Sequence, residues 1–177
     1  MVKEAQLERV ASGLAPVTPG WFVVNTRDAE WLVTDTFGCG TQFESEKHRF
    51  PQVGFNITVL EPGEPNCLYH REAMQEDFLV LAGECLLLIE GEERPLKAWD
   101  FVHCPKGTEH VFVGAGSGPC AVLAVGSRSG GGVVYPASEL AQRHGAGVPE
   151  ETHKPEEAYA GFQRDTDVAY REGWLPG

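Results

Sequence analysis

The stretch from Pro62 to Gly83, PGEPNCLYHREAMQEDFLVLAG, places a histidine and two carboxylates where the chain becomes strongly apolar. Side chains in a strand repeat on one face every second residue, so His70 and Glu72 would project together, about 7 Å apart. Glu76 comes after three intervening residues, at the expected start of the next antiparallel strand. A hairpin would fold that strand beside the first, so we expect the three side chains to share one cavity.

A second polar patch, WDFVHCPKGTEHVFVG from Trp99 to Gly114, supplies a fourth candidate. Pro105 and Gly107 predict a turn, and His110 would open the strand that follows. Burying two imidazoles and two carboxylates in an apolar interior is costly unless a partner compensates them, and a divalent metal ion is such a partner. Two histidines with one carboxylate form the facial arrangement that is typical of non-haem Fe(II).

The two patches resemble the paired motifs of the cupin superfamily. The first motif of that family joins a glycine, the pair His-x-His, a glutamate and a second glycine. The second motif joins a glycine, the turn Pro-x-Gly, a histidine and an asparagine. The corresponding positions here are, in chain order, Gly63, His70, Glu72, Glu76 and Gly83, then Trp99, Pro105, Gly107, His110 and Gly114.

This resemblance covers residues 50–127 and implies a small antiparallel double-stranded β-helix, the cupin or jelly-roll barrel. It also implies that His70, Glu76 and His110 are ligands of one divalent metal ion per subunit, with Fe, Mn, Zn and Ni as the candidates. Cupins of this size commonly pair through their sheets, so the resemblance further implies a homodimer.

The sequence departs from the cupin pattern at four positions. One extra residue follows Gly63, and Trp99 and Gly114 stand where the family usually has glycine and asparagine. The departure that matters for chemistry is Glu72, which replaces the second histidine of the first motif. If Glu72 binds the metal, which is the reading we favour, two carboxylates would shift the preference towards Mn(II) or Fe(II). If Glu72 turns away, it becomes a candidate general base beside the ion.

Two neighbouring groups could be mistaken for further ligands. Cys67 precedes His70 by three positions, so it is expected to face the other side of its strand and to pack in the core. His103, two residues before Pro105, is expected to be a hydrogen-bonded residue at the rim of the site.

Short apolar segments separated by glycine and proline turns predict a strand-rich region. The expected strands are residues 21–25, 30–35, 53–60, 67–72, 76–82, 84–90, 93–98, 100–104, 110–114 and 120–126. Strands without intervening helices indicate an all-β sandwich or barrel, because parallel sheets need crossover connections. We therefore divide the chain into a helical N-terminal arm (1–20), a β-barrel (21–132) and a helical C-terminal extension (133–177).

Three short helices are expected outside the barrel. Residues 3–14 place Leu7, Val10 and Leu14 on one helical stripe. Residues 138–145 begin at Ser138 as an N-cap, and residues 155–162 begin at a proline in the first turn. The extension is too small for a core of its own, so it is expected to pack on the barrel or on a second subunit.

The composition excludes several classes of partner. The formal net charge is −12, from 14 basic and 26 acidic residues, so neither nucleic acid nor an anionic membrane surface is an expected partner. The N-terminal segment is charged and amphipathic, which does not suggest a signal peptide. Five cysteines without a C-x-x-C pair favour a reduced, cytoplasmic protein.

A metal held by three or four protein ligands keeps open positions, as catalysis requires. The first hypothesis is therefore a metal-dependent enzyme acting on a small organic substrate that chelates the ion through oxygen. Dioxygenase chemistry comes first and lyase or isomerase chemistry second, with Glu72 or Glu76 accepting a proton. The alternative is a non-catalytic cupin that binds or senses a small molecule. In either case we expect apolar pocket walls, formed by Phe55, Ile57, Val59, Phe78, Val80 and Phe112.

Overall fold

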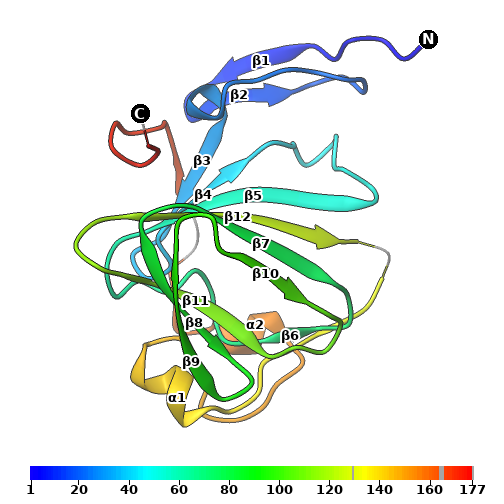
Figure 1. The fold of residues 1–177 in the computed structure, drawn as a ribbon. Coiled ribbons are helices and arrows are strands. Elements are labelled where there is room, and N and C mark those ends of the chain that lie inside the picture. The colour runs from blue at the N-terminus through cyan, green and yellow to red at the C-terminus, as the bar shows by residue number, and fades with distance from the viewer. Residues whose placement is uncertain (129, 164–165, 177) are drawn as a thin grey trace.

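The computed structural model describes residues 1–128, 130–163 and 166–176 and is built almost entirely from antiparallel strands (Figure 1). One sheet has the strand order β10-β7-β12-β5-β4-β3-β14, and a second has the order β11-β8-β9. The strands of the first sheet are β3 (Glu30–Val33), β4 (Cys39–Gln42), β5 (Val53–Leu60), β7 (Glu76–Ala82), β10 (Phe101–Cys104), β12 (Cys120–Ser127) and β14 (Thr166–Val168). Those of the second are β8 (Glu84–Ile89), β9 (Glu92–Lys97) and β11 (His110–Ala115). The predicted all-β class is confirmed.

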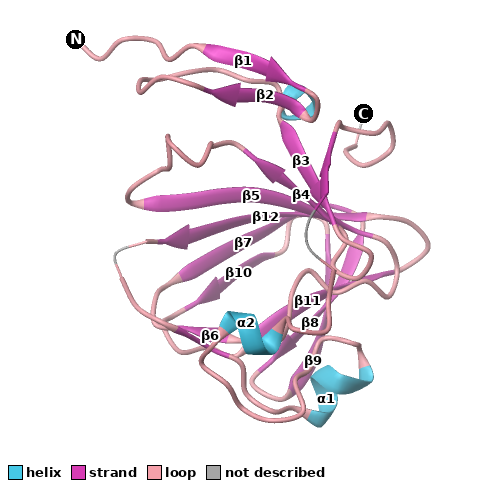
Figure 2. Ribbon diagram, turned by 180° about the vertical axis from the view of Figure 1, so that it is seen from behind, coloured by secondary structure: helices cyan, strands magenta, loops and turns pink. Residues whose placement is uncertain are grey.

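The two sheets face each other and enclose the main core, as the view from behind also shows (Figure 2). Strands β7 and β12 contribute every second residue to it, because successive side chains of a strand point to opposite faces, and β5 contributes Leu60. Its fully or nearly fully buried members include Leu60, Phe78, Val80, Leu87, Phe112 and Val122. Phe78, Val80 and Phe112 therefore point inward as predicted.

The expectation that Phe55, Ile57 and Val59 of β5 face inward is wrong. In the pairing of β5 with β12, Leu60 lies opposite Cys120, Thr58 opposite Val122 and Asn56 opposite Ala124, and these β12 residues are on the core side. The inner face of β5 thus carries Asn56, Thr58 and Leu60. The alternation of side chains separates the two faces of β5 correctly, but it does not show which face is inside. The outer face is apolar as well, because Trp31, Trp174 and Leu175 cover it.

The N-terminal arm is a hairpin, so the prediction of a helix at residues 3–14 is wrong. Strands β1 (Leu7–Val10) and β2 (Gly13–Pro16) pair antiparallel and lie at one end of the molecule (Figure 1). A short helix in water is marginal, and β2 gains burial instead, with Ala15 only 6% exposed. Gly13 has φ +152° and lies so close to the Ala29 carbonyl that a Cβ atom would be 2.2 Å from its oxygen.

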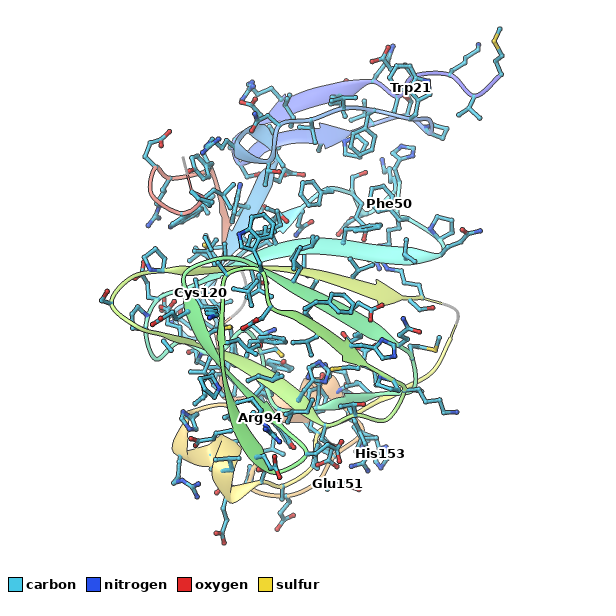
Figure 3. The ribbon with its side chains drawn as sticks, viewed as in Figure 1. Trp21, Phe50, Arg94, Cys120, Glu151 and His153 are labelled. Carbon is cyan, nitrogen blue, oxygen red and sulfur yellow. The ribbon has the colours of Figure 1, made fainter. Side chains whose placement is uncertain are left out.

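Most of the expected barrel strands are confirmed, with two corrections. Residues 21–25 form no strand but lead into the 3-10 helix η1 (Thr26–Asp28), and residues 67–72 form only the two-residue strand β6 (Arg71–Glu72). The sequence missed β4, β14 and β13 (Val133–Val134), which pairs with β6. At four residues β4 is short, and its glycine and glutamine give little strand signal. Trp21 lies beside the N-terminal hairpin, and Phe50, from the β4–β5 connection, lies between that hairpin and β5 (Figure 3).

The C-terminal extension packs on the barrel. Its two helices, α1 (Glu139–Arg143) and α2 (Pro155–Ala158), lie where they were predicted, and Ser138 caps α1 by accepting from the Ala141 N–H. Leu68, Tyr135 and Ala158 form a cluster that joins the extension to the barrel. In the described part of the chain, no helix has the length and hydropathy to cross a membrane.

Two of the departures from the cupin pattern are explained by the backbone, one by a turn and one by a close contact. Trp99 has φ +76°, a left-handed conformation that favours glycine, and its side chain lies in solvent with 75% of its surface exposed. Gly114 is needed where it stands, because a Cβ atom there would lie 2.1 Å from the Glu61 carbonyl oxygen. The Gly63 N–H donates to the Gly114 carbonyl, so this contact also anchors the start of the first motif.

Candidate metal centre

Backbone pairing places the two predicted histidine ligands side by side. The His110 N–H donates to the His70 carbonyl (2.8 Å) and the His70 N–H donates to the His110 carbonyl (3.2 Å). Residues that exchange both bonds in an antiparallel pair project to the same face. The two imidazole rings therefore meet inside the barrel, with centroids 4.8 Å apart.

Glu76 joins the pair from the other sheet. It is the first residue of β7, which folds back after β6, and its Oε2 lies 3.4 Å from Nε2 of His110 and 3.8 Å from Nε2 of His70. One ligand atom from each of His70, Glu76 and His110 lies within 4.8 Å of the others. We call these three residues the metal centre. First-row ions bind such atoms at about 2.0–2.2 Å, so a small contraction would bring all three onto one ion.

Each imidazole is held with Nε2 facing the centre. Nδ1 of His70 is 2.9 Å from the Leu68 carbonyl oxygen, and Nδ1 of His110 is 3.0 Å from the Thr108 carbonyl oxygen. A carbonyl oxygen only accepts, so we assign the proton to Nδ1 and the lone pair to Nε2 in both rings. Metal-binding histidines typically use this arrangement, with the second ring nitrogen donating to a carbonyl or carboxylate.

The centre contains a buried polar atom whose bonding capacity is unmet. Within the described residues, Nε2 of His110 is the buried side-chain nitrogen or oxygen without a hydrogen-bond partner, although the Glu76 carboxylate is close. The His110 side chain is only 2% exposed, and the Glu76 side chain 17%. An unpaired buried acceptor of this kind is costly, and a cation at the centre would remove the cost.

The electrostatics of the centre follow from burial. Burial, followed by the charge of the neighbouring His70, lowers the pKa of His110 to about 4. Burial likewise lowers the pKa of His70, against the opposing effects of its hydrogen bond to Leu68 and of Glu72. Burial, followed by the charge of Glu72, raises the pKa of Glu76 to about 7. Both imidazoles are thus neutral near neutral pH, which is the form that binds a metal.

Aromatic rings wall the centre. The Phe78 ring packs edge-on against His110 at 5.2 Å, and the Phe112 ring lies 6.5 Å from His110. Tyr135, from the C-terminal extension, lies 6.1 Å from the ring of His70. These rings exclude water from one side of the centre and strengthen electrostatic interactions within it.

Glu72 lies beside the metal centre but is not one of the three grouped ligands. Its negative charge acts on His70, Glu76 and Tyr135. The side chain is partly exposed at the end of β6. Coordination by Glu72 therefore stays a prediction, and its alternative role as a general base fits this position.

The other two neighbouring groups are not members of the centre. Cys67 packs against the cluster of Tyr69, Leu88 and Val111, as predicted, but the prediction that it faces away from His70 is wrong, because its Sγ lies 3.6 Å from Nδ1 of His70. His103 is exposed and its Nδ1 lies 2.6 Å from the Asp77 carboxylate, in agreement with the predicted role at the rim.

Sequence reasoning missed two tyrosines of the extension. Tyr135 borders His70, and the hydroxyl of Tyr159 accepts from the Leu68 N–H (3.1 Å). The rings of these tyrosines pack edge to face, with centroids 5.7 Å apart. The aromatic residues in an otherwise polar extension could have indicated that it packs on the barrel. The sequence around them does not show which part of the barrel they contact.

Comparison with known families agrees with this geometry. Residues 56–126 match the model of the family described as Cupin domain, and this range contains all three residues of the metal centre. The chain carries a cupin domain. The resemblance inferred from the two motifs is thereby confirmed. A search of the curated proteins gave no match.

Solved structures show the same cupin fold. The polyketide cyclase RemF from Streptomyces resistomycificus is 16% identical over 62% of this chain and 80% of its own, with a TM-score of 0.53. A predicted oxalate decarboxylase from Thermotoga maritima is 23% identical over 60% of this chain and 98% of its own, with a TM-score of 0.52.

A sugar phosphate isomerase of the cupin superfamily from Silicibacter pomeroyi is 30% identical to this chain over 47% of it, with a TM-score of 0.44. The match covers 54% of that protein, so this cupin spans about half the length of that relative. The two structures with TM-scores above 0.5 support the double-stranded β-helix fold and say nothing of the activity of this chain.

Proposed function

We propose that this cupin is a metal-dependent enzyme that acts on a small organic substrate able to chelate the metal through oxygen. The observation that carries the proposal is the orphaned Nε2 of His110, facing Nε2 of His70 and the Glu76 carboxylate. His70, Glu76 and His110 would hold one divalent ion. Three protein ligands leave coordination positions for other molecules, which catalytic sites need and structural sites lack.

Dioxygenase chemistry is our first assignment. Two histidines and one carboxylate are the ligand set of many non-haem Fe(II) oxygenases, in which the ion binds a chelating substrate together with O₂. The protein's own contribution is to hold both imidazoles neutral and correctly turned, and to shield them with Phe78 and Phe112. Fe(II) or Mn(II) suits this assignment better than Zn or Ni.

Lyase or isomerase chemistry is the second assignment, and the position of Glu72 supports it. A carboxylate beside the centre but outside its ligand group is free to remove and return a proton. In such a reaction the ion supplies Lewis-acid stabilisation of negative charge on the substrate. Glu72 would then be the general base, and Glu76 would remain a ligand.

The test is elemental analysis of untagged protein, followed by oxygen uptake with a panel of catechols, diketones and hydroxy acids. Bound iron or manganese with substrate-dependent oxygen uptake supports the dioxygenase assignment. Product formation without oxygen uptake supports the second assignment. Recovery of unaltered ligand from every member of the panel would favour a non-catalytic binding or sensor protein.

We also propose that two copies pair through the outer face of the larger sheet. Phe101, Leu79 and Leu123 lie side by side across β10, β7 and β12, outside the cluster in which Trp31 and Trp174 cover the outer face of β5. Phe101 is 65% exposed at the edge strand of this apolar row. Light scattering should give twice the mass of the chain at micromolar concentration, and Phe101→Glu should give the monomer. A monomeric parent protein would contradict the pairing.

A further inference from the structure

A cavity lies near the metal centre, between strands β3, β4 and β5 of the barrel and the segment around α2. Its volume is about 880 Å³, within the range of small-molecule sites. We call it the α2 cavity. In the described part of the chain, its walls include none of the three residues of the metal centre. The nearest approach is through Cys67, which lines the cavity and lies 3.6 Å from Nδ1 of His70.

One wall of the α2 cavity is aromatic. Phe37 comes from the turn between β3 and β4, and Tyr159 and Phe162 come from the C-terminal extension. The Phe37 centroid lies 5.5 Å from Tyr159 and 4.9 Å from Phe162, and Tyr159 lies 6.0 Å from Phe162. Rings that already pack against one another lose little freedom on binding, and they favour a flat ligand.

The opposite wall offers neutral hydrogen-bonding groups. Asn56 and Thr58 lie on the inner face of β5, and among the described residues neither side chain has a hydrogen-bond partner. Asn56 is exposed although it faces inward, which shows that the barrel is open at this place. An amide and a hydroxyl can donate to and accept from a ligand without requiring that it carry a charge.

The charges around the cavity disfavour anions. Its described lining contains no lysine, arginine or histidine, and it includes the carboxylate of Glu156 on α2. The whole chain carries a net charge of −12. A phosphorylated or dicarboxylic ligand would therefore enter against repulsion and find no cationic partner.

From these observations we propose that the α2 cavity binds an uncharged, flat organic molecule with hydroxyl or carbonyl groups. Its ring would lie against Phe37, Tyr159 and Phe162, and its polar groups would reach Asn56 and Thr58. The C-terminal extension thereby determines which molecules bind. This site needs no metal ion, so it stands apart from the proposed function.

The experiment compares two probes that share a ring system and differ in charge, 2-naphthol and 2-naphthyl phosphate. Calorimetric titration uses the full chain after removal of metal with a chelator, so its outcome does not depend on the metal centre. We expect saturable one-to-one binding of 2-naphthol, at least about tenfold tighter than that of the phosphate ester. Equal affinities, or no saturable binding of 2-naphthol, would overturn the proposal.

Substitutions in the lining of the α2 cavity test whether 2-naphthol binds there. Thr58→Val keeps the shape of the side chain and should weaken 2-naphthol binding about fivefold, whereas Phe162→Ala should weaken it about tenfold. Glu156→Lys should tighten binding of the phosphate ester and leave 2-naphthol within about twofold. Trp99→Ala, which removes an exposed aromatic ring that lines neither the cavity nor the metal centre, is the matched control and should change neither affinity. Binding of 2-naphthol that ignores both Thr58→Val and Phe162→Ala would place it elsewhere and overturn the assignment.

Discussion

At the metal centre the backbone fixes the side chains, whereas in the α2 cavity several side chains have no partner. Both imidazoles of the centre donate to carbonyl oxygens, and a pair of backbone hydrogen bonds joins their residues. In the cavity, Asn56 and Thr58 make no side-chain hydrogen bond with the described residues, and one wall comes from the extension. This difference fits the two proposed tasks. Strand pairing preorganises the residues proposed to bind the metal, whereas a ligand of the α2 cavity would complete an open part of the barrel.

The largest expected effect comes from removing a ligand of the centre. His110→Ala should lower bound metal from about one ion per chain to less than about one tenth, because two ligands hold a first-row ion poorly. The far-ultraviolet circular dichroism spectrum should stay that of the parent, since the cupin core does not depend on this imidazole. Elemental analysis of the purified variant gives the measurement.

The matched control for this variant is His103→Ala. His103 is also a histidine close to the second motif, but it faces solvent and pairs with Asp77. It should retain full metal content. Unchanged metal in His110→Ala, or equal loss in both variants, would show that the ion is held elsewhere.

The pH dependence of metal binding tests the environment of the centre. Burial raises the pKa of Glu76 to about 7 in the metal-free protein, so a proton competes with the ion below that pH. His110, with a pKa lowered to about 4, stays neutral and adds no competing proton above pH 5. Affinity should rise by almost tenfold per pH unit below pH 7, about 50-fold from pH 5 to 7, and should level off above pH 8.

Competition with a chelator of known affinity at pH 5, 6, 7 and 8 measures this profile. A flat profile between pH 5 and 7 would mean that Glu76 is not a ligand. A rise of about 100-fold per pH unit would mean that a second proton is displaced.

The Glu72→Gln variant distinguishes the two roles left open for this residue. The charge of Glu72 contributes to the raised pKa of Glu76, so its removal should lower that pKa. At pH 6 the variant should then bind metal about threefold more tightly than the parent, and at pH 8 about equally. Glu84→Gln, at the exposed start of β8, is the control. A tenfold loss of affinity at pH 8 would instead identify Glu72 as a ligand.

The smallest expected effect concerns the link between the two regions. The Leu68 peptide donates its N–H to the hydroxyl of Tyr159, and its carbonyl accepts from Nδ1 of His70. Tyr159→Phe should therefore weaken metal binding by about threefold, because it removes the acceptor of the Leu68 N–H and so loosens the residue whose carbonyl orients His70. Tyr170→Phe, whose hydroxyl lies beside Arg27 on the far side of the sheet, should have no effect. Equal metal affinity in both variants would show that the regions are independent.

Most of the core strands and the grouping of His70, Glu76 and His110 could be predicted from the sequence. Turn residues and period-two alternation mark β5, β7 and β12, and the motif spacing marks His70, Glu76 and His110. What could not be predicted depends on contacts across the chain. The outer face of β5 is apolar because Trp31 and Trp174 cover it, and this cover is invisible from β5 itself. Tyr135 and Tyr159 reach the site only because the extension folds back.

The prediction of a helix in the N-terminal arm was wrong for a related reason. Leu7, Val10 and Leu14 share the spacing of a helix, but the segment is too short to form one without tertiary support. The close approach of Gly13 to Ala29, which fixes the hairpin instead, involves a residue far along the chain.

The central claim is that His70, Glu76 and His110 together hold one metal ion. Anomalous diffraction from crystals of metal-loaded protein, measured at the absorption edge of the bound element, tests it most directly. We expect one peak per chain, about 2.0–2.3 Å from Nε2 of both histidines and from a Glu76 oxygen. A metal-saturated protein with no peak between these atoms, or with its peak beside other residues, would contradict it.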